Sequence, residues 1–189
     1  ETAAIYLDKS QQTFAVHTII TNKDLAHTYR ELARVGPDYF YRGDFANKTA
    51  DWMKKNNGVI TRADFANYQI KLREPIVSQF AGYTLYGFPP PSSGGIHVAQ
   101  ILNILENFDL HKTTSSERYH LMAEAMKFAF ADRAHWLGDT DFVKVPLSLT
   151  DKAYAQRIAK KIQLDKAVNN VVHGNPELDI PHLMDRHTT

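Results

Sequence analysis

The sequence contains no cysteine in its 189 residues, which excludes disulfide frameworks, zinc–thiolate sites and cysteine nucleophiles. Apolar runs are short, and none approaches the ~20 residues that a membrane-spanning helix requires. Neither sign of charge prevails, because 22 basic side chains balance 21 acidic ones. The basic surface typical of DNA- and RNA-binding proteins is therefore missing, and we expect no nucleic-acid partner.

Apolar residues make up 43% of the chain and charged residues 23%, which is ordinary for a globular domain. The length suffices for one domain with a real core, and we find no internal repeat and no clear interdomain linker. The sequence starts at Glu1 without an initiator Met or a signal peptide. We therefore expect it to be a piece of a longer protein.

Helical periodicity recurs along most of the chain, interrupted by turn residues. Capping boxes at 61–64 and 114–117 mark two helix starts, because a threonine and an acidic residue three positions later satisfy each other's backbone amides. Apolar residues over 75–88, with a turn at Ala81-Gly82, predict a β-hairpin. Residues 11–20 are predicted to be extended. The predicted helices cover 24–35, 40–56, 61–68, 114–137 and 151–162, with a further helix after Ser93 that carries an apolar stripe from Ile101 to Phe108.

The loop 89–95 combines three prolines, two serines and two glycines before that further helix. Backbone amides at a helix start can bind an anion, but the spacing matches neither the GxxxxGK nor the GxGxxG phosphate loop. We interpret the loop as a rigid strand-to-helix corner. In this interpretation Ser92 and Ser93 cap the helix, and Gly94-Gly95 permits a close backbone approach.

The predicted helix 114–137 carries polar side chains for which structural roles are favoured over catalytic ones. His120 and Glu124 lie four residues apart, which is the spacing of a helix-surface pair and not the HExxH pattern of a metalloprotease. Asp132 and Arg133 are interpreted as an ion pair or cap. The stripe of this helix is interpreted as core: Met122, Ala125, Met126, Ala129, Phe130 and Arg133.

Asp132, Asp139 and Asp141 cluster near the end of the same helix, without the alternating ligands and glutamate of an EF-hand loop. A metal site there is the minor alternative to a structural role. The basic face of helix 151–162 is interpreted as a solvated surface; it comprises Lys152, Arg157, Lys160 and Lys161.

Thr188 and Thr189 follow a polar, turn-rich run. A terminal threonine by itself indicates only a tail. A threonine whose own α-amine is freed by chain cleavage, however, carries nucleophile and base in one residue. Since the free α-amine has a pKa of about 8, it can accept the hydroxyl proton near neutrality.

Several segments together resemble the large subunit of the γ-glutamyltranspeptidase family. The resemblance covers nearly the whole chain, and the motifs are specific as a set although each is weak alone. The segments are YTLYGFPPPSSGGIH at 83–97, QILNILENFD at 100–109, EAMKFAFADR at 124–133, LGD at 137–139, GPDYFYRG at 36–43 and GVIT at 58–61.

This resemblance implies an N-terminal-nucleophile hydrolase. Precursors of the family cut themselves before a Thr-Thr pair into a large and a small subunit. The new N-terminal threonine then attacks γ-glutamyl amides such as glutathione and passes the acyl group to water or to an amino-acid or peptide acceptor. For this sequence, the resemblance implies that His187–Thr188 is the scissile bond, that Thr188 is the catalytic nucleophile after cleavage and that Thr189 supports it. No cofactor and no metal are implied.

The same resemblance implies that residues 1–189 are the C-terminal portion of the large subunit, with 169–189 the loop or tail before the scissile bond. The expected fold is a mainly α (α+β) fragment of an αββα sandwich with a short hairpin near 75–88. The substrate-gripping Arg, the oxyanion-hole glycines and the small-subunit residues are expected elsewhere. Arg42, Arg73 and Arg118 are therefore not assigned those roles. We expect the fragment alone to be inactive, its partner to be the small subunit of the same precursor, and its location to be periplasmic or secreted.

Two alternatives remain open at this stage. A related acylase, similar to cephalosporin acylases or capsule-processing transpeptidases, would use the same pair of threonines on another substrate. A non-catalytic helical interaction module would need only the amphipathic helices and capped turns.

Overall fold

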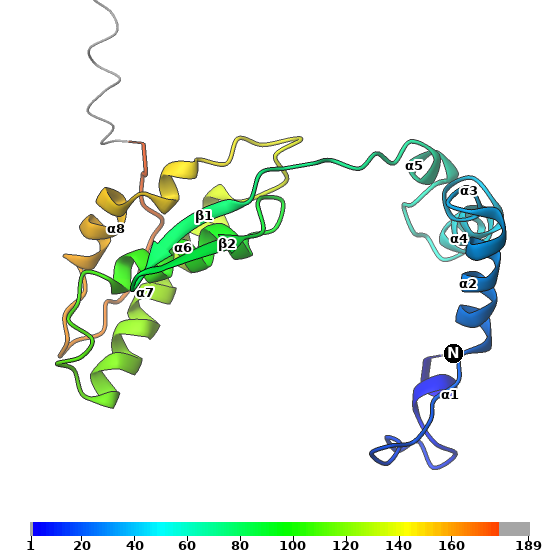
Figure 1. Ribbon diagram of the computed structural model, residues 1–189, viewed down its shortest axis with the longest axis horizontal. Coiled ribbons are helices and arrows are strands. Elements are labelled where there is room, and N and C mark those ends of the chain that lie inside the picture. Colours follow the sequence, from blue (N-terminus) through cyan, green and yellow to red (C-terminus); the bar gives the residue numbers. More distant parts are fainter. Residues whose placement is uncertain (1, 178–189) are drawn as a thin grey trace, which may run out of the picture. The chain divides into compact units, whose positions relative to one another are not determined.

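The computed structural model describes residues 2–177, and the chain divides into two compact units (Figure 1). The N-terminal unit is Glu1–Lys71 and the C-terminal unit is Leu72–Thr189. Residues 68–75, where the division falls, form neither helix nor strand. These joining residues carry no Pro/Gly-rich signal, in line with the absence of a clear linker in the sequence.

The N-terminal unit is helical in the part that the structure describes. Its helix α2 starts one residue earlier than Asp24, because the Asn22 side chain accepts a hydrogen bond from Leu25 N at 2.9 Å and caps the helix. The helix ends as predicted at Gly36, whose φ of 84° suits glycine. The helices of this unit are α1 (Thr2–Tyr6), α2 (Lys23–Val35), α3 (Asp38–Tyr41), α4 (Asp44–Lys55) and α5 (Arg62–Ala66).

Two predictions for this unit are wrong in detail. The predicted helix 40–56 is instead covered by two separate helices, α3 and α4, because the backbone of Arg42 and Gly43 between them leaves the helical conformation. Residues 11–20 form no strand. Positive φ values at Gln11 and His17 turn that stretch, and Leu7 and Thr13 make only an isolated bridge.

The C-terminal unit contains the predicted hairpin. Strands β1 (Ile76–Phe80) and β2 (Tyr83–Gly87) pair antiparallel, with Ile76 opposite Gly87 and Phe80 opposite Tyr83. Positive φ at Ala81 and Gly82 makes the two-residue turn that follows the twist of the strands. The helices of this unit are α6 (Gly94–Leu105), α7 (Ser115–Trp136), the 3₁₀ helix η1 (Leu147–Thr150) and α8 (Lys152–Ala159).

Both predicted capping boxes are confirmed. Thr61 and Asp64 start α5, and Thr114 and Glu117 start α7, each pair making the two reciprocal hydrogen bonds. The Asp64 carboxylate accepts hydrogen bonds from the Thr61 hydroxyl and, with a smaller effect, from the Thr61 backbone amide, and both lower the pKa of Asp64. The Glu117 carboxylate likewise accepts hydrogen bonds from the Thr114 backbone amide and, with a smaller effect, from the Thr114 hydroxyl, and both lower the pKa of Glu117. The same local device therefore opens a helix in each unit.

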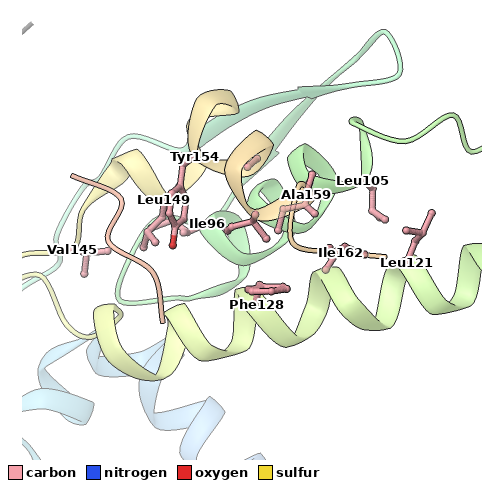
Figure 2. Packing of buried hydrophobic residues seen from close by; sticks show 13 residues of the cluster. Ile96, Leu105, Leu121, Phe128, Val145, Leu149, Tyr154, Ala159 and Ile162 are labelled. Atoms are coloured by element: carbon pink, nitrogen blue, oxygen red, sulfur yellow. The ribbon is translucent and has the colours of Figure 1, made fainter. Parts of the chain in front are cut away.

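The hydrophobic core of the C-terminal unit lies between α6, α7, η1 and α8 (Figure 2). Ile96 from α6, Leu121 and Phe128 from α7, and Leu149 from η1 point into it. Ile76 and Phe80 of the hairpin pack against its edge. The described residues are thus mainly helical with a two-stranded hairpin, as the sequence predicted at this coarse level.

The stripe of α7 that was predicted to be core is only partly buried. Ala125 and Ala129 are buried, whereas Met122, Met126 and Phe130 are about half exposed. The inward face carries instead Leu121, Glu124, Ala125, Phe128, Ala129 and Asp132. Both sets share the helical spacing, so periodicity alone favoured the larger apolar side chains over a face that includes two carboxylates.

Of the predicted basic face, Lys152, Lys160 and Lys161 are exposed, in agreement with a solvated surface, and Arg157 is partly buried. Lys152 Nζ donates to the Gln79 carbonyl at 2.9 Å and also binds the Glu106 carboxylate. Arg157 and Lys161 lie over the rings of Tyr154 and Phe128, at 5.2 and 5.9 Å from the ring centroids. Their aliphatic stems and charges therefore contribute to packing. Of the helices in residues 2–177, none combines the length and apolarity needed to cross a membrane.

Candidate functional site

The predicted catalytic residues Thr188 and Thr189, and the predicted scissile bond at His187, lie outside the residues that the structure describes. The chain that leads toward them is described as far as Glu177. We call residues 168–177 the leading segment. It forms no helix or strand, as predicted for the residues after 169, yet its backbone is held firmly by side chains of α7.

Asp132 holds the leading segment at Gly174. Its side chain is only 1% exposed, and its Oδ1 accepts a hydrogen bond from Gly174 N at 2.7 Å. Its Oδ2 accepts from Gln100 Nε2 of α6 at 2.5 Å and from the Tyr154 hydroxyl of α8 at 2.7 Å. Three donors facing one carboxylate satisfy a buried acceptor that would otherwise be costly.

Burial raises the pKa of the Tyr154 hydroxyl, and the hydrogen bond to Asp132 adds to that effect. The hydroxyl therefore stays protonated and remains a donor to Asp132 across the physiological pH range. Through this bond and that of Gln100, α6, α7 and α8 meet at a single carboxylate.

Trp136 binds the other backbone group of the same glycine. Its indole Nε1–H donates to Gly174 O at 3.0 Å, so both the N–H and the C=O of Gly174 are engaged by α7. His135 stacks on His173 with the ring centroids 3.5 Å apart and the planes within 2° of parallel. Only glycine fits at 174, because a Cβ there would lie 2.0 Å from the Tyr154 hydroxyl oxygen.

A second attachment lies earlier in the leading segment. Glu124 is 2% exposed, and its Oε2 accepts from Val168 N at 3.1 Å while its Oε1 pairs with Lys127 Nζ at 2.8 Å. Lys127 Nζ also donates to Val168 O. Two residues of α7 thus satisfy both backbone groups of Val168, much as a neighbouring strand would.

These contacts correct two predictions from the sequence. Glu124 does not form a surface pair with His120; it is buried, and His120 Nε2 contacts Gln163 O at 2.7 Å. Asp132 does not pair with Arg133, whose Nε donates to Ser93 Oγ at 3.0 Å. The error has a physical cause, since the partners that bury the two acids lie 22 to 44 residues away in sequence. The sequence carried no clear signal for this, because the face of α7 that bears both acids was not the stripe that periodicity favoured.

The loop 89–95 connects β2 to α6 as the strand-to-helix corner that we expected. Gly94 N donates to Ser92 Oγ at 3.3 Å and Gly95 N donates to Phe88 O at 3.2 Å, so these amides are engaged within the loop itself. A Cβ at Gly95 would lie 2.3 Å from Phe88 O, which confirms the close backbone approach. Ser93 occupies the N-cap position without a side-chain cap, and its hydroxyl instead receives Arg133.

No metal site is apparent in the described part of the chain, where no group of three or more His, Cys, Asp or Glu side chains is arranged to hold an ion. Asp139 and Asp141 instead form ion pairs with Arg73 at 3.8 and 2.8 Å. Arg42 pairs with Asp38 at 3.0 Å, and Arg118 donates to Ser115 Oγ at 3.2 Å. Arg42, Arg73 and Arg118, to which we assigned no substrate-binding role, thus each have a hydrogen-bond or ion-pair partner within the chain.

Comparison with known proteins agrees with the resemblance seen in the motifs. The family model described as gamma-glutamyltranspeptidase matches residues 1–189. The chain belongs to the gamma-glutamyltranspeptidase family.

Members of the family provide close relatives of this chain. The glutathione hydrolase proenzyme of Escherichia coli K12 is 50% identical over 151 residues, which are 78% of this chain and 26% of that protein. The Acylase ACY 1 proenzyme of Pseudomonas sp. SE83 is 45% identical over the same share of this chain and 27% of its own length. The chain therefore spans about a quarter of the curated relatives that it matches.

The fold also agrees with a solved member of the gamma-glutamyltranspeptidase family. The crystal structure of the Helicobacter pylori gamma-glutamyltranspeptidase superposes with a TM-score of 0.82 and 38% sequence identity. The match covers 96% of this chain and 53% of that one. The arrangement of helices and hairpin described above is thus the arrangement of a gamma-glutamyltranspeptidase segment.

Proposed function

We propose that this chain is part of a self-cleaving γ-glutamyltranspeptidase, which transfers or hydrolyses the γ-glutamyl group of glutathione and related amides. The observation that carries the proposal is the family match over residues 1–189, a range that includes the Thr188-Thr189 pair. The name of the Escherichia coli relative, a glutathione hydrolase proenzyme, supports both the substrate and the precursor state.

Self-cleavage follows from the chemistry of the pair His187–Thr188. In the precursor, Thr188 Oγ attacks the His187 carbonyl carbon; a C–O bond forms, the C–N bond breaks, and the hydroxyl proton passes to the departing nitrogen. Water then hydrolyses the resulting ester. The products are the His187 carboxylate and a threonine with a free α-amine.

The same residue then serves the mature reaction. The freed amine, with a reference pKa of about 8, accepts the proton of the Thr188 hydroxyl as that oxygen attacks the γ-glutamyl carbonyl. The C–N bond of the substrate amide then breaks, and the departing amine takes the proton held by the Thr188 α-amine. Water or an amino-acid or peptide amine finally takes the γ-glutamyl group from Thr188 Oγ, which recovers its proton. Thr189 supports Thr188 by hydrogen bonding in this proposal.

For the organisation of the whole protein, we propose that residues 1–189 comprise the C-terminal portion of the large subunit and, beyond the processing site at His187–Thr188, the first two residues of the small subunit. The partner is then the small subunit from the same precursor, and the complete fold is an αββα sandwich. Residues 169–189 lead to the scissile bond, and α7 holds the described beginning of that stretch. A periplasmic or secreted location is part of the same proposal, and cell fractionation with an antibody to the chain tests it.

The acylase relative favours a second candidate function. The name of the Pseudomonas protein, Acylase ACY 1 proenzyme, indicates that the family also includes processed acylases. Purified full-length protein assayed in parallel on glutathione and on a glutaryl amide separates the two candidates. Faster release of glutarate than of glutamate would favour the acylase.

The decisive test is Thr188→Ala in the full-length precursor. We expect it to abolish cleavage, because no hydroxyl remains to start the acyl shift, so that mass spectrometry finds only the uncut chain. Thr188→Ser keeps a hydroxyl and should still cleave. Thr18→Ala, at an exposed threonine of the N-terminal unit, is the matched control and should cleave like the wild type. A fully cut Thr188→Ala precursor would refute the proposed nucleophile.

A further inference from the structure

Helix α7 has a second apolar face, which we call the outer face and define by Tyr119, Met122, Met126 and Phe130. These residues recur at intervals of three and four, so their side chains follow one line along the helix. Their exposed fractions are 73%, 46%, 41% and 51%, whereas Leu121 and Phe128 point from α7 into the core (Figure 2). The outer face thus extends over about three turns of the helix and is only partly buried.

Charged side chains, which normally cover the outward side of a surface helix, are missing from the outer face. In the part of α7 that carries this face, the charged residues are Glu124, Lys127 and Asp132, and all three bind the leading segment. A helix that is apolar on two sides is typical of one that is covered on two sides in a larger protein. We therefore expect a further layer of protein over α7.

Most of the enzyme proposed above lies outside residues 1–189, since the chain spans about a quarter of its curated relatives. After a precursor is cut, its two subunits stay together only through contacts between them. The chain contains no cysteine, so it can contribute no disulfide to their association. Burial of apolar surface is then the main force available to hold the second subunit.

We propose that the outer face of α7 binds the small subunit of the same precursor, against an apolar surface of that subunit. The proposal rests on the function proposed above, because it requires a cut precursor, and it adds an interaction surface to that function. The residue types suit a contact of this kind. Methionine adapts its flexible side chain to irregular partner surfaces, and tyrosine, phenylalanine and methionine are enriched at protein–protein interfaces.

Photo-crosslinking identifies what covers the outer face. The full-length precursor carries p-benzoylphenylalanine in place of Met126, is allowed to cleave and is then irradiated. We expect a band with the summed mass of the large and small subunits, and mass spectrometry should find a small-subunit peptide joined at position 126. The same label in place of Lys112, whose side chain is 85% exposed between α6 and α7, is the control and should give much less of that band.

A positive charge on the outer face tests whether this contact holds the subunits together. Tyr119→Lys and Met126→Lys each place an ammonium group there, and lysine is a good helix former, so α7 itself should persist. We expect each to raise the dissociation constant of the two subunits about tenfold or more, because a buried, unpaired charge is costly. The constant is measured by size-exclusion chromatography of the cleaved enzyme over a dilution series in moderate urea.

Tyr83→Lys is the matched control for Tyr119→Lys. It changes the same residue type at a similar exposure, 75% on β2 of the same unit, and should leave the dissociation constant unchanged. Crosslinking at position 126 introduces no charge, so it decides the question where a lysine variant stays uncut.

The outcomes separate the two proposals. A wild-type precursor that never cleaves overturns the proposed function, and this interface with it. A cut wild-type protein whose position 126 crosslinks to a second large subunit, to another part of its own large subunit or to nothing overturns only the interface. An unchanged dissociation constant in both outer-face variants, or an equal increase in Tyr83→Lys, also overturns only the interface.

Discussion

In the C-terminal unit, 13 buried residues drawn from α6, α7, η1, α8 and the loops beside them form one cluster. In the described part of the N-terminal unit, the buried apolar residues are Tyr39, Ala46 and Ala50. Aromatic side chains provide much of the packing in this unit: Phe40 stacks on Phe45 with ring centroids 4.3 Å apart, and Phe65 contacts both rings edge-on.

This difference shows two ways of holding capped helices together. The C-terminal unit joins elements distant in sequence around fully buried aliphatic side chains, so its stability depends on many contacts at once. The N-terminal unit relies on caps within the chain and on half-buried rings, each of which contributes about 0.5–1.5 kcal/mol beyond its buried area. We therefore expect the C-terminal unit to be the more stable of the two.

The chain provides a reporter for each unit. Its two tryptophans are Trp52 in α4 and Trp136 in α7. Labelling with 5-fluorotryptophan therefore gives one ¹⁹F resonance per unit, and urea titrations of the two resonances measure the unfolding of each unit separately. A wild-type chain whose two resonances change at the same urea concentration would contradict the expected order.

The largest effect is expected from Leu149→Ala in the C-terminal unit. Leu149 is fully buried in the cluster, and truncation of such a leucine costs about 3–5 kcal/mol through lost burial and the cavity left behind. The Trp136 resonance should report unfolding at much lower urea, while that of Trp52 stays unchanged. Leu147→Ala, in the same 3₁₀ helix but 60% exposed, should change little. Equal effects of the two substitutions would show that the cluster is not the source of stability.

A smaller effect is expected from Phe65→Ala in the N-terminal unit. The substitution removes ring contacts with Phe40 and Phe45, at centroid distances of 5.8 and 6.2 Å, and should cost about 2 kcal/mol because the ring is only partly buried. The Trp52 resonance measures the loss, and exposed Val59→Ala is the control. A parallel shift of the Trp136 resonance would mean that the two units unfold as one.

The two capping boxes allow the same substitution to be compared in both units, since each unit contains one capping box. Thr61→Ala and Thr114→Ala each remove the hydroxyl that accepts an amide of the first helical turn, and each should cost about 1 kcal/mol. Thr61→Ala should act on the Trp52 resonance and Thr114→Ala on that of Trp136. The corresponding serine variants keep the hydroxyl and should lose less. A large cost in one unit only would show that tertiary contacts, and not the cap, set the value.

The smallest effect is expected from pH between 7.5 and 5.5, at His97 of the C-terminal unit. Burial, together with the charge of Arg133, lowers the pKa of the His97 imidazole, although Asp132 acts in the opposite direction. The folded state therefore favours neutral His97. As the pH falls below the unfolded value of about 6.5, the unfolded chain takes up a proton that the folded chain does not, so stability falls.

His97→Gln should reduce this acid dependence between pH 7.5 and 5.5, as measured by thermal unfolding with the Trp136 resonance. His111→Gln, at an exposed histidine of the same unit, should leave it unchanged. An identical acid dependence in wild type and His97→Gln would exclude His97 as its source.

Much of the local structure was predictable from the sequence because it depends on neighbouring residues. The hairpin, both capping boxes, the end of α2 at Gly36 and the corner before α6 each follow from turn chemistry or from side chains three residues apart. The family was predictable as well, because the motifs at 83–97 and 124–133 are specific when taken together.

Other features were not predictable, since they depend on partners distant in sequence. The inward positions of Glu124 and Asp132 follow from Val168 and Gly174, more than 40 residues later. Periodicity predicted α7 correctly but selected the wrong set of buried side chains. Alanines and carboxylates face inward along α7, where Val168 and Gly174 approach the helix closely.

The sequence by itself determined the capped starts of α5 and α7, the end of α2, the hairpin turn and the family to which the chain belongs, because these depend on local backbone preferences and on residue identity. Only the tertiary structure decided which face of α7 is buried, that the chain divides near Lys71, and that the leading segment is bound at Val168 and Gly174. The physical reason is that burial and buried hydrogen bonds are set by what a side chain meets in space, and a carboxylate on an apolar stripe is stable there only when distant backbone amides arrive to satisfy it.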